Sequence, residues 1–148
     1  MTKTNLIAAF AALLALAPAA WAAPAGVTLE AKVAPVIVMP AGEEDVTAPV
    51  TLTLANESDR AVTLRTSNRC QIQIWKVTDS TGGTVMNHGI CPMIYQPQYN
   101  TLAAGERQTE DESISLQAAK CREGETYTLH YRFWGVIAEA KFTVNRGK

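Results

Sequence analysis

Apolar and polar residues alternate along most of the chain after residue 23, a two-residue period typical of β-strands with one buried face. Strands are expected near Val27 to Val33, at 50–55, 62–66 and 70–77, from Thr84, and at 99–102, 112–116, 127–133 and 138–144. Polar or glycine-bearing turns separate several of them. Eight or nine short strands without helical periodicity predict an all-β fold, an immunoglobulin-like antiparallel β-sandwich.

The turns also predict how the strands connect. Asn56 to Arg60 is expected to join its two flanking strands as a β-hairpin. If every strand runs the length of the sandwich, successive turns alternate between its two ends. The three cysteines, Cys70, Cys91 and Cys121, then lie together at one end.

The chain begins like a secretory signal peptide. Lys3 precedes an apolar run at 6–16, and small residues stand at Ala20 and Ala22. The run is too short to span a bilayer comfortably, so we expect cleavage near Ala22, no membrane insertion, and a periplasmic or secreted protein.

Cleavage there leaves about 126 of the 148 residues, enough for one domain with a real core. We expect the following organisation: a signal peptide at 1–22, an N-terminal strand and linker at 23–45, the sandwich at 46–144, and a flexible tail at 145–148.

The net charge of the chain bears on which classes of partner it could bind. The formal net charge is −1, and removal of Lys3 with the signal peptide takes it to about −2. Nucleic acid and anionic membranes need a basic face, so neither is expected as a partner. A protein partner is expected instead.

In an oxidising compartment a disulfide is the default, and an odd number of cysteines leaves one unpaired. Cys70 and Cys91 lie almost symmetrically about the turn at Ser80 and Thr81, so they would face each other on neighbouring antiparallel strands, within disulfide reach. Pairing of Cys91 with Cys121 remains an alternative.

An ordered set of segments carries a resemblance to a known family. The chain reads TLTLANESDRAVTLRTSNRCQIQIWKVTDSTGG, then YQPQYNTLAAGE, then GETYTLHYRF. This succession, within residues 46–144, resembles the intracellular proteinase inhibitor family of bacilli, the BsuPI domains. The resemblance implies an immunoglobulin-like sandwich and inhibition of serine proteases. The chain departs from that family in its signal peptide and its three cysteines.

The stretch CPMIY at residues 91–95 resembles the reactive loop of the Streptomyces subtilisin inhibitor family. That resemblance implies a loop of Cys91, Pro92, Met93, Ile94 and Tyr95 that contacts a subtilisin-type protease. Met93 would enter the specificity pocket, and the bond between Met93 and Ile94 would be the bait bond. It also implies a Cys91–Cys121 disulfide, because Cys121 follows 30 positions later.

The residue types suit that role. Pro92 fixes its own φ and keeps Cys91 extended, which lowers the cost of ordering the loop on binding. Met93 is a flexible apolar anchor. In the alternative interpretation, Met93, Ile94 and Tyr95 pack as a cap on one end of the core.

Other side chains give little sign of chemistry. His88 is expected in a solvated loop and His130 on the outer face of a strand, and no G-x-S-x-G elbow accompanies the serines, so no enzyme is expected. No close pair of cysteines suggests a metal site, and no cofactor is expected. The acidic run 106–112 is interpreted as a solvated edge strand.

The sequence therefore predicts an exported protein-binding β-sandwich that acts as a proteinase inhibitor on serine proteases. One alternative is a structural or adaptor module of the cell envelope. Another is a carbohydrate-binding module that uses Trp75 and Trp134, although packing in the core and at its rim accounts for both rings.

Overall fold

A computed structural model describes residues 24–92 and 94–147, which form ten β-strands and two 3-10 turns. The strands are β1 (Val27–Val33), β2 (Val36–Met39), β3 (Asp45–Asn56), β4 (Val62–Thr66), β5 (Gln73–Thr78), β6 (Thr84–Asn87), β7 (Gln98–Leu102), β8 (Arg107–Gln117), β9 (Thr126–Phe133) and β10 (Val136–Arg146). The 3-10 turns are η1 (Arg69–Ile72) and η2 (Ala118–Lys120). The signal peptide and its cleavage site near Ala22 lie outside the described residues.

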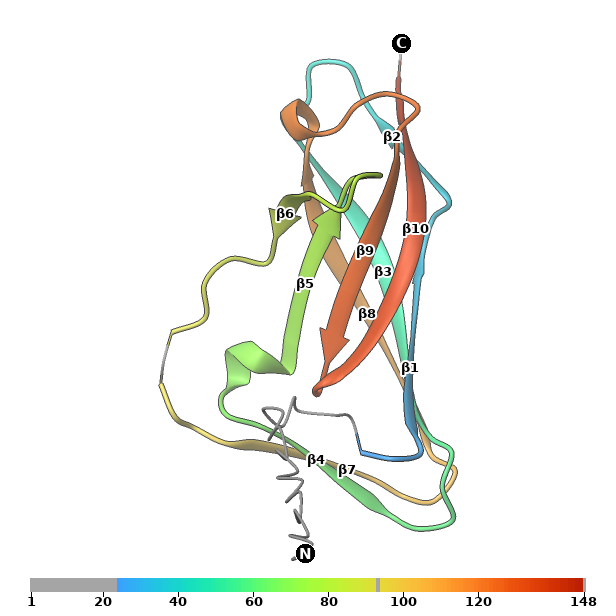
Figure 1. Cartoon of the computed structure of the whole chain (residues 1–148), viewed down its shortest axis with the longest axis vertical. Coiled ribbons are helices and arrows are strands. Elements are labelled where there is room, and N and C mark those ends of the chain that lie inside the picture. The colour runs from blue at the N-terminus through green and yellow to red at the C-terminus, as the bar shows by residue number, and fades with distance from the viewer. Residues whose placement is uncertain (1–23, 93, 148) are drawn as a thin grey trace, which may run out of the picture.

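The strands form a β-sandwich, which confirms the predicted fold class. One sheet has the order β1-β3-β8, and the facing sheet has the order β2-β10-β9-β5-β6 (Figure 1). Neighbours pair antiparallel except β2 and β10, which are parallel. Alternate residues of both sheets fill the core, and the largest fully buried ones include Leu52, Leu54, Ile114, Leu116, Tyr127, Leu129, Tyr131 and Phe142. None of the helices in the described part of the chain is long and apolar enough to cross a membrane.

The opening segment is shared between the two sheets. β1 pairs with β3, and after Ala34 and Pro35 the chain crosses to run beside β10 as β2. The two sheets correspond to the A-B-E and G-F-C-C′ sheets of immunoglobulin-like domains. The segment 23–45 was expected as one N-terminal strand and a linker, but it holds a second strand, β2. Asn145 and Arg146 were expected in a flexible tail, but they belong to β10 and pair with β2.

A tyrosine corner closes the connection between β8 and β9. Tyr127 lies near the start of β9, is 1% exposed, and its hydroxyl oxygen accepts a 2.7 Å hydrogen bond from the backbone N–H of Arg122. The same hydroxyl donates to the Glu125 carboxylate at 3.1 Å. A tyrosine at this place whose hydroxyl bonds back to the preceding loop is a hallmark of immunoglobulin-like sandwiches.

Replacing Tyr127 by phenylalanine is expected to lower the free energy of unfolding by about 1–3 kcal/mol, because the N–H of Arg122 loses its partner in a partly buried place. Urea denaturation followed by circular dichroism measures the change. Tyr99→Phe is the matched control, since Tyr99 is 62% exposed and should show almost no change. Equal effects of the two substitutions would contradict the assignment of the corner.

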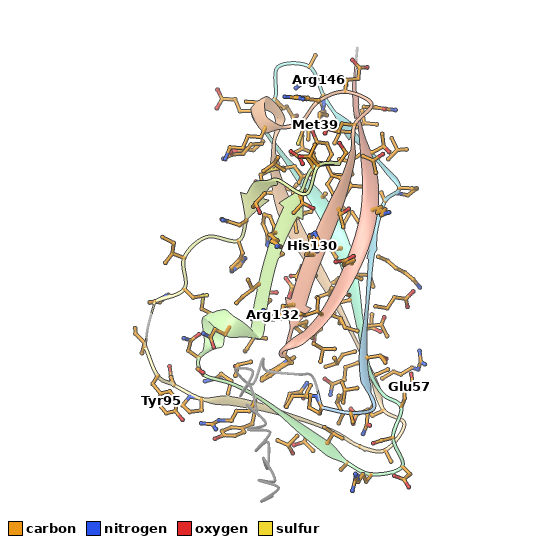
Figure 2. All side chains as sticks on the ribbon, in the orientation of Figure 1. Met39, Glu57, Tyr95, His130, Arg132 and Arg146 are labelled. Atoms are coloured by element: carbon orange, nitrogen blue, oxygen red, sulfur yellow. A yellow bond between two sulfur atoms is a disulfide. The ribbon has the colours of Figure 1, made fainter. Side chains whose placement is uncertain are left out.

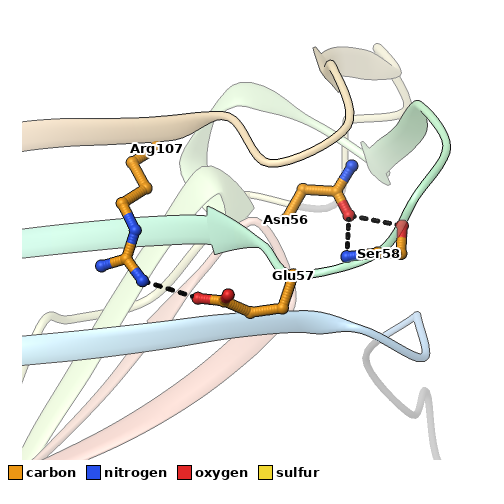
Figure 3. A network of polar contacts seen from close by, with 4 residues as sticks. All are labelled: Asn56, Glu57, Ser58 and Arg107. Atoms are coloured by element: carbon orange, nitrogen blue, oxygen red, sulfur yellow. Dashed lines mark hydrogen bonds and ion pairs between the residues drawn. The ribbon is translucent and has the colours of Figure 1, made fainter.

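The prediction of a β-hairpin at Asn56 to Arg60 is wrong. β4 pairs with β7 instead of β3, and the two make a separate ribbon at one end of the sandwich (Figure 1). The side chain of Asn56 explains the break: it is completely buried and bonds the backbone of Arg60, Leu102 and Ala103, which redirects the chain away from β3. Ser58 bonds its carboxamide oxygen from the other side (Figure 3).

The prediction that all three cysteines lie at one end of the sandwich is also wrong, and the ribbon of β4 and β7 is the reason. Because β4 does not run the length of the sandwich, the expected alternation of turns between the two ends fails. The turn at 79–83 therefore lies beside the loop that follows β8, where the Ser80 hydroxyl contacts the Glu125 carboxylate at 3.2 Å. Cys121 lies in that loop directly after η2, whereas Cys70 lies in η1, at the opposite end of β5 (Figure 1).

Candidate functional site

The loop 88–97 connects β6 to β7 and bows outward from β5 (Figure 1). Its apolar side chains are open to solvent: Ile90 is 98% exposed, Ile94 65% and Tyr95 70%. Pro92 is exposed as well. The alternative that Ile94 and Tyr95 cap the core is therefore wrong. Met93, the expected contact residue, lies outside the described residues.

A disulfide between Cys70 and Cys91 anchors this loop, with the two Cα atoms 5.7 Å apart. This confirms the pairing predicted from symmetry about the turn, and the alternative Cys91–Cys121 pairing is wrong. The expected cross-strand setting is also wrong, because Cys70 lies in η1 and Cys91 in the loop. Cys121 is a free thiol, 3% exposed, and its burial raises its pKa, which keeps it protonated and unreactive.

Asn68 supports the loop from within, a role that was not predicted from the sequence. Its carboxamide oxygen accepts a hydrogen bond from the N–H of Gln71 at 3.0 Å, so it caps η1. Its carboxamide nitrogen donates to the carbonyl oxygen of Pro92 at 3.2 Å. Asn68 is 8% exposed, so its end of the bond to Pro92 is sheltered from water. The preference of asparagine for helix N-caps was the only sequence signal for this role.

Two further contacts hold the end of the loop that leads into β7. The backbone N–H of Gln96 donates to the carbonyl of Ser67 at 2.9 Å. The Arg65 guanidinium donates to the Tyr95 hydroxyl, and its carbon lies 6.0 Å from the Tyr95 ring centre and 5.9 Å from that of Tyr99. Figure 2 shows Tyr95 where the loop meets the ribbon. The residues on both sides of Met93 are thus tied to β4 and η1.

The histidines lie as predicted, His88 in a loop and His130 on the outer face of a strand. His88 is exposed and meets the ring of Trp75 edge-on, with centroids 6.1 Å apart. His130 Nδ1 lies 2.8 Å from the Glu139 carboxylate, and its Nε2 lies 2.9 Å from the Thr78 hydroxyl. Thr78 is only 6% exposed, so its hydroxyl is not presented to a substrate.

The remaining candidate residues are the two tryptophans and the acidic run 106–112. Trp75 is 8% exposed and packs in the core. Trp134 is half-buried, and its ring meets the ring of its chain neighbour Phe133 edge-on. The acidic run 106–112 enters β8, an edge strand, as expected. Within residues 24–92 and 94–147, no group of three or more metal-ligating side chains comes together.

No protein-family model matches the chain, and no curated protein matches it. Among solved structures, a β-glucosidase from Listeria innocua is similar with a TM-score of 0.45 and 15% identity, over 82% of this chain and 16% of that chain. The alkylpurine DNA glycosylase AlkC of Pseudomonas fluorescens is similar with a TM-score of 0.45 and 16% identity, over 81% of this chain and 30% of that chain. A β-glucuronidase from Bacteroides uniformis has a TM-score of 0.41 and 11% identity, over 80% and 13% of the respective chains. These likenesses do not indicate an enzymatic function for this chain.

Proposed function

We propose that this protein is an exported protein-binding module that contacts its partner through the loop 88–97. The observation that carries the proposal is the combination of exposed apolar side chains with a fixed backbone: Ile90, Ile94 and Tyr95 face solvent on a loop tied down at Cys91 and Pro92. A disulfide of this kind also suits the oxidising compartment that an exported protein enters.

Tethering matters because binding must offset the cost of ordering the loop. Each immobilised side chain costs roughly 0.5–1.5 kcal/mol, and a loop already held in one shape avoids part of that cost. The disulfide holds Cys91, Asn68 holds the carbonyl of Pro92, and Arg65 holds Tyr95. The three anchors flank Met93 on both sides, as a substrate-like inhibitor requires.

The partner class that we propose is a subtilisin-type serine protease, with the bond between Met93 and Ile94 as the bait bond. The support is the resemblance of CPMIY to an inhibitor loop, together with the exposure of Pro92 and Ile94 on either side of Met93. A protease reads an extended, accessible segment, and these residues are not covered by the sandwich.

A second candidate is a non-inhibitory adaptor module of the cell envelope. It is favoured by the cluster of Arg65, Tyr95 and Tyr99, since arginine and tyrosine are enriched at the energetic centres of protein interfaces. Carbohydrate binding through Trp75 and Trp134 is less well supported, because Trp75 is largely covered.

In the inhibitor proposal, the mature protein inhibits subtilisin, and Met93→Asp or Met93→Gly raises the inhibition constant at least about 30-fold, the loss typical of a central contact residue. Steady-state inhibition assays measure it. Val38→Asp is a matched control, because it adds the same charge at a 55% exposed aliphatic residue of β2. No inhibition by the parent at micromolar concentration would remove the protease as partner. Inhibition unchanged by both Met93 variants would remove only the bait bond.

A further inference from the structure

A shallow hollow lies on the outer face of the five-stranded sheet, next to the ribbon. It has a volume of about 420 Å3 and is lined chiefly by Arg65, Gln71, Ile74, Arg132 and Ile137. It is formed where the end of β4, η1, β5 and the β9–β10 turn meet. None of the described residues of loop 88–97 lines it, and the hollow meets that loop only through Arg65, which also contacts Tyr95.

Its floor is a row of three side chains across three strands. Arg132 on β9 is directly opposite Ile74 on β5 and Ile137 on β10. Ile137 is 60% exposed and Ile74 is partly exposed, so a guanidinium group stands between two accessible aliphatic side chains. Figure 2 shows Arg132 near the lower end of β9.

The second arginine of the hollow is already positioned. Arg65 lies against the rings of Tyr95 and Tyr99 and donates one hydrogen bond to the Tyr95 hydroxyl. A guanidinium carries five N–H donors, so most of its donors remain for a ligand. Holding the group in place reduces the entropy lost when a carboxylate binds to it.

The charges in the hollow are uncompensated. No acidic side chain lines it. The ion pairs among the described residues join Lys32 to Glu30, Arg107 to Glu57 and His130 to Glu139, and none involves Arg65 or Arg132. Glu139 lies in the next row of the same sheet face, opposite His130, which binds it. The hollow is therefore cationic within a chain whose net charge is −1.

We propose that this hollow binds an extended, acidic segment of a polypeptide partner, with carboxylates on Arg65 and Arg132 and an aliphatic side chain between Ile74 and Ile137. Arginine is suited to this because its planar fork matches a carboxylate with two parallel hydrogen bonds. The apolar floor favours a peptide over a free small acid, since burial of an aliphatic side chain adds to the ionic contact.

The test is a titration of the whole mature protein, carrying 13C-labelled isoleucine methyl groups, with two capped peptides. One is Ac-GEIDIEG-NH2, and its twin Ac-GQINIQG-NH2 replaces every carboxylate by an amide. The acidic peptide is expected to shift the methyl signals of Ile74 and Ile137 to saturation, and the twin to bind at least about tenfold more weakly. Arg132→Gln and Arg65→Gln are each expected to weaken the acidic peptide at least about tenfold.

Arg60→Gln is the matched control, because it removes the same charge from an exposed residue of the turn after β3 and should leave the affinity unchanged. Amide spectra of the variants verify that they are folded. The proposal is overturned if neither peptide shifts Ile74 and Ile137, if the two peptides bind equally, or if Arg60→Gln weakens binding as much as Arg132→Gln. The proposal is also overturned if acetate shifts the signals of Ile74 and Ile137 as strongly as the acidic peptide does. In that case the ligand of the hollow would be a small acid and not a peptide.

Discussion

Replacing Asn56 by alanine is expected to lower the free energy of unfolding by about 3–5 kcal/mol. The carboxamide is completely buried, and its nitrogen lies 2.8 Å from the carbonyl oxygen of Arg60, 2.9 Å from that of Ala103 and 3.2 Å from that of Leu102. Its oxygen accepts from the N–H of Ser58 at 3.1 Å and from the Ser58 hydroxyl (Figure 3). Truncation leaves several backbone groups without partners where water has little access.

Urea denaturation at constant m-value measures this change. Ser58→Ala is the matched control, because it removes a single hydroxyl partner and should cost about 0.5–1.5 kcal/mol. Asn56→Asp keeps the acceptor oxygen but loses the donors, so its cost should approach that of alanine. If Asn56→Ala lowers the free energy of unfolding no more than Ser58→Ala does, the Asn56 side chain does not hold the ribbon to the sandwich.

Replacing Cys70 and Cys91 together by serine is expected to lower the free energy of unfolding by about 2–4 kcal/mol. The disulfide joins residues separated by 21 positions, and without it the unfolded chain regains the entropy of that closed loop. If the proposed function holds, the variant is also expected to inhibit subtilisin more weakly, because Cys91 no longer fixes the loop 88–97.

Reductant supplies the control for this variant. Dithiothreitol should lower the stability of the parent to that of the double variant and should leave the double variant unchanged, since its remaining cysteine, Cys121, is unpaired. Equal stability of the parent and the variant in oxidising buffer would mean that the bond does not form in the native protein.

The strands could be predicted because their alternation is local. Tyr127, Leu129 and Tyr131 face the core on β9 as their spacing indicated, and β1 and β4 have the predicted bounds. β2 escaped prediction because VIVM is short, follows Pro35 and does not alternate in polarity. The pairing of β4 with β7 could not be predicted. Alternation indicates which residues of a strand share a face, but it does not indicate the neighbouring strand.

The features of the loop 88–97 that depend on local sequence could be predicted, and those that depend on strand pairing could not. The Cys70–Cys91 bond followed from positions symmetric about a turn, whereas the contact of Arg65 with Tyr99 depends on the register of β4 against β7. Ile94 and Tyr95 were ambiguous in sequence, because an apolar residue in a loop can pack inward or face a partner. Their exposure could be decided only by the path of the loop in space.

We propose that the loop 88–97 binds in the active site of a subtilisin-type protease as a bait. Peptide mass spectrometry of the mature protein mixed with subtilisin tests this proposal most directly. We expect one cut, between Met93 and Ile94, which accumulates slowly and stops at a limiting fraction while the rest of the chain stays intact. Rapid cutting at other bonds of the loop followed by continued degradation would contradict the account, because an exposed loop that is only a substrate is consumed in that way.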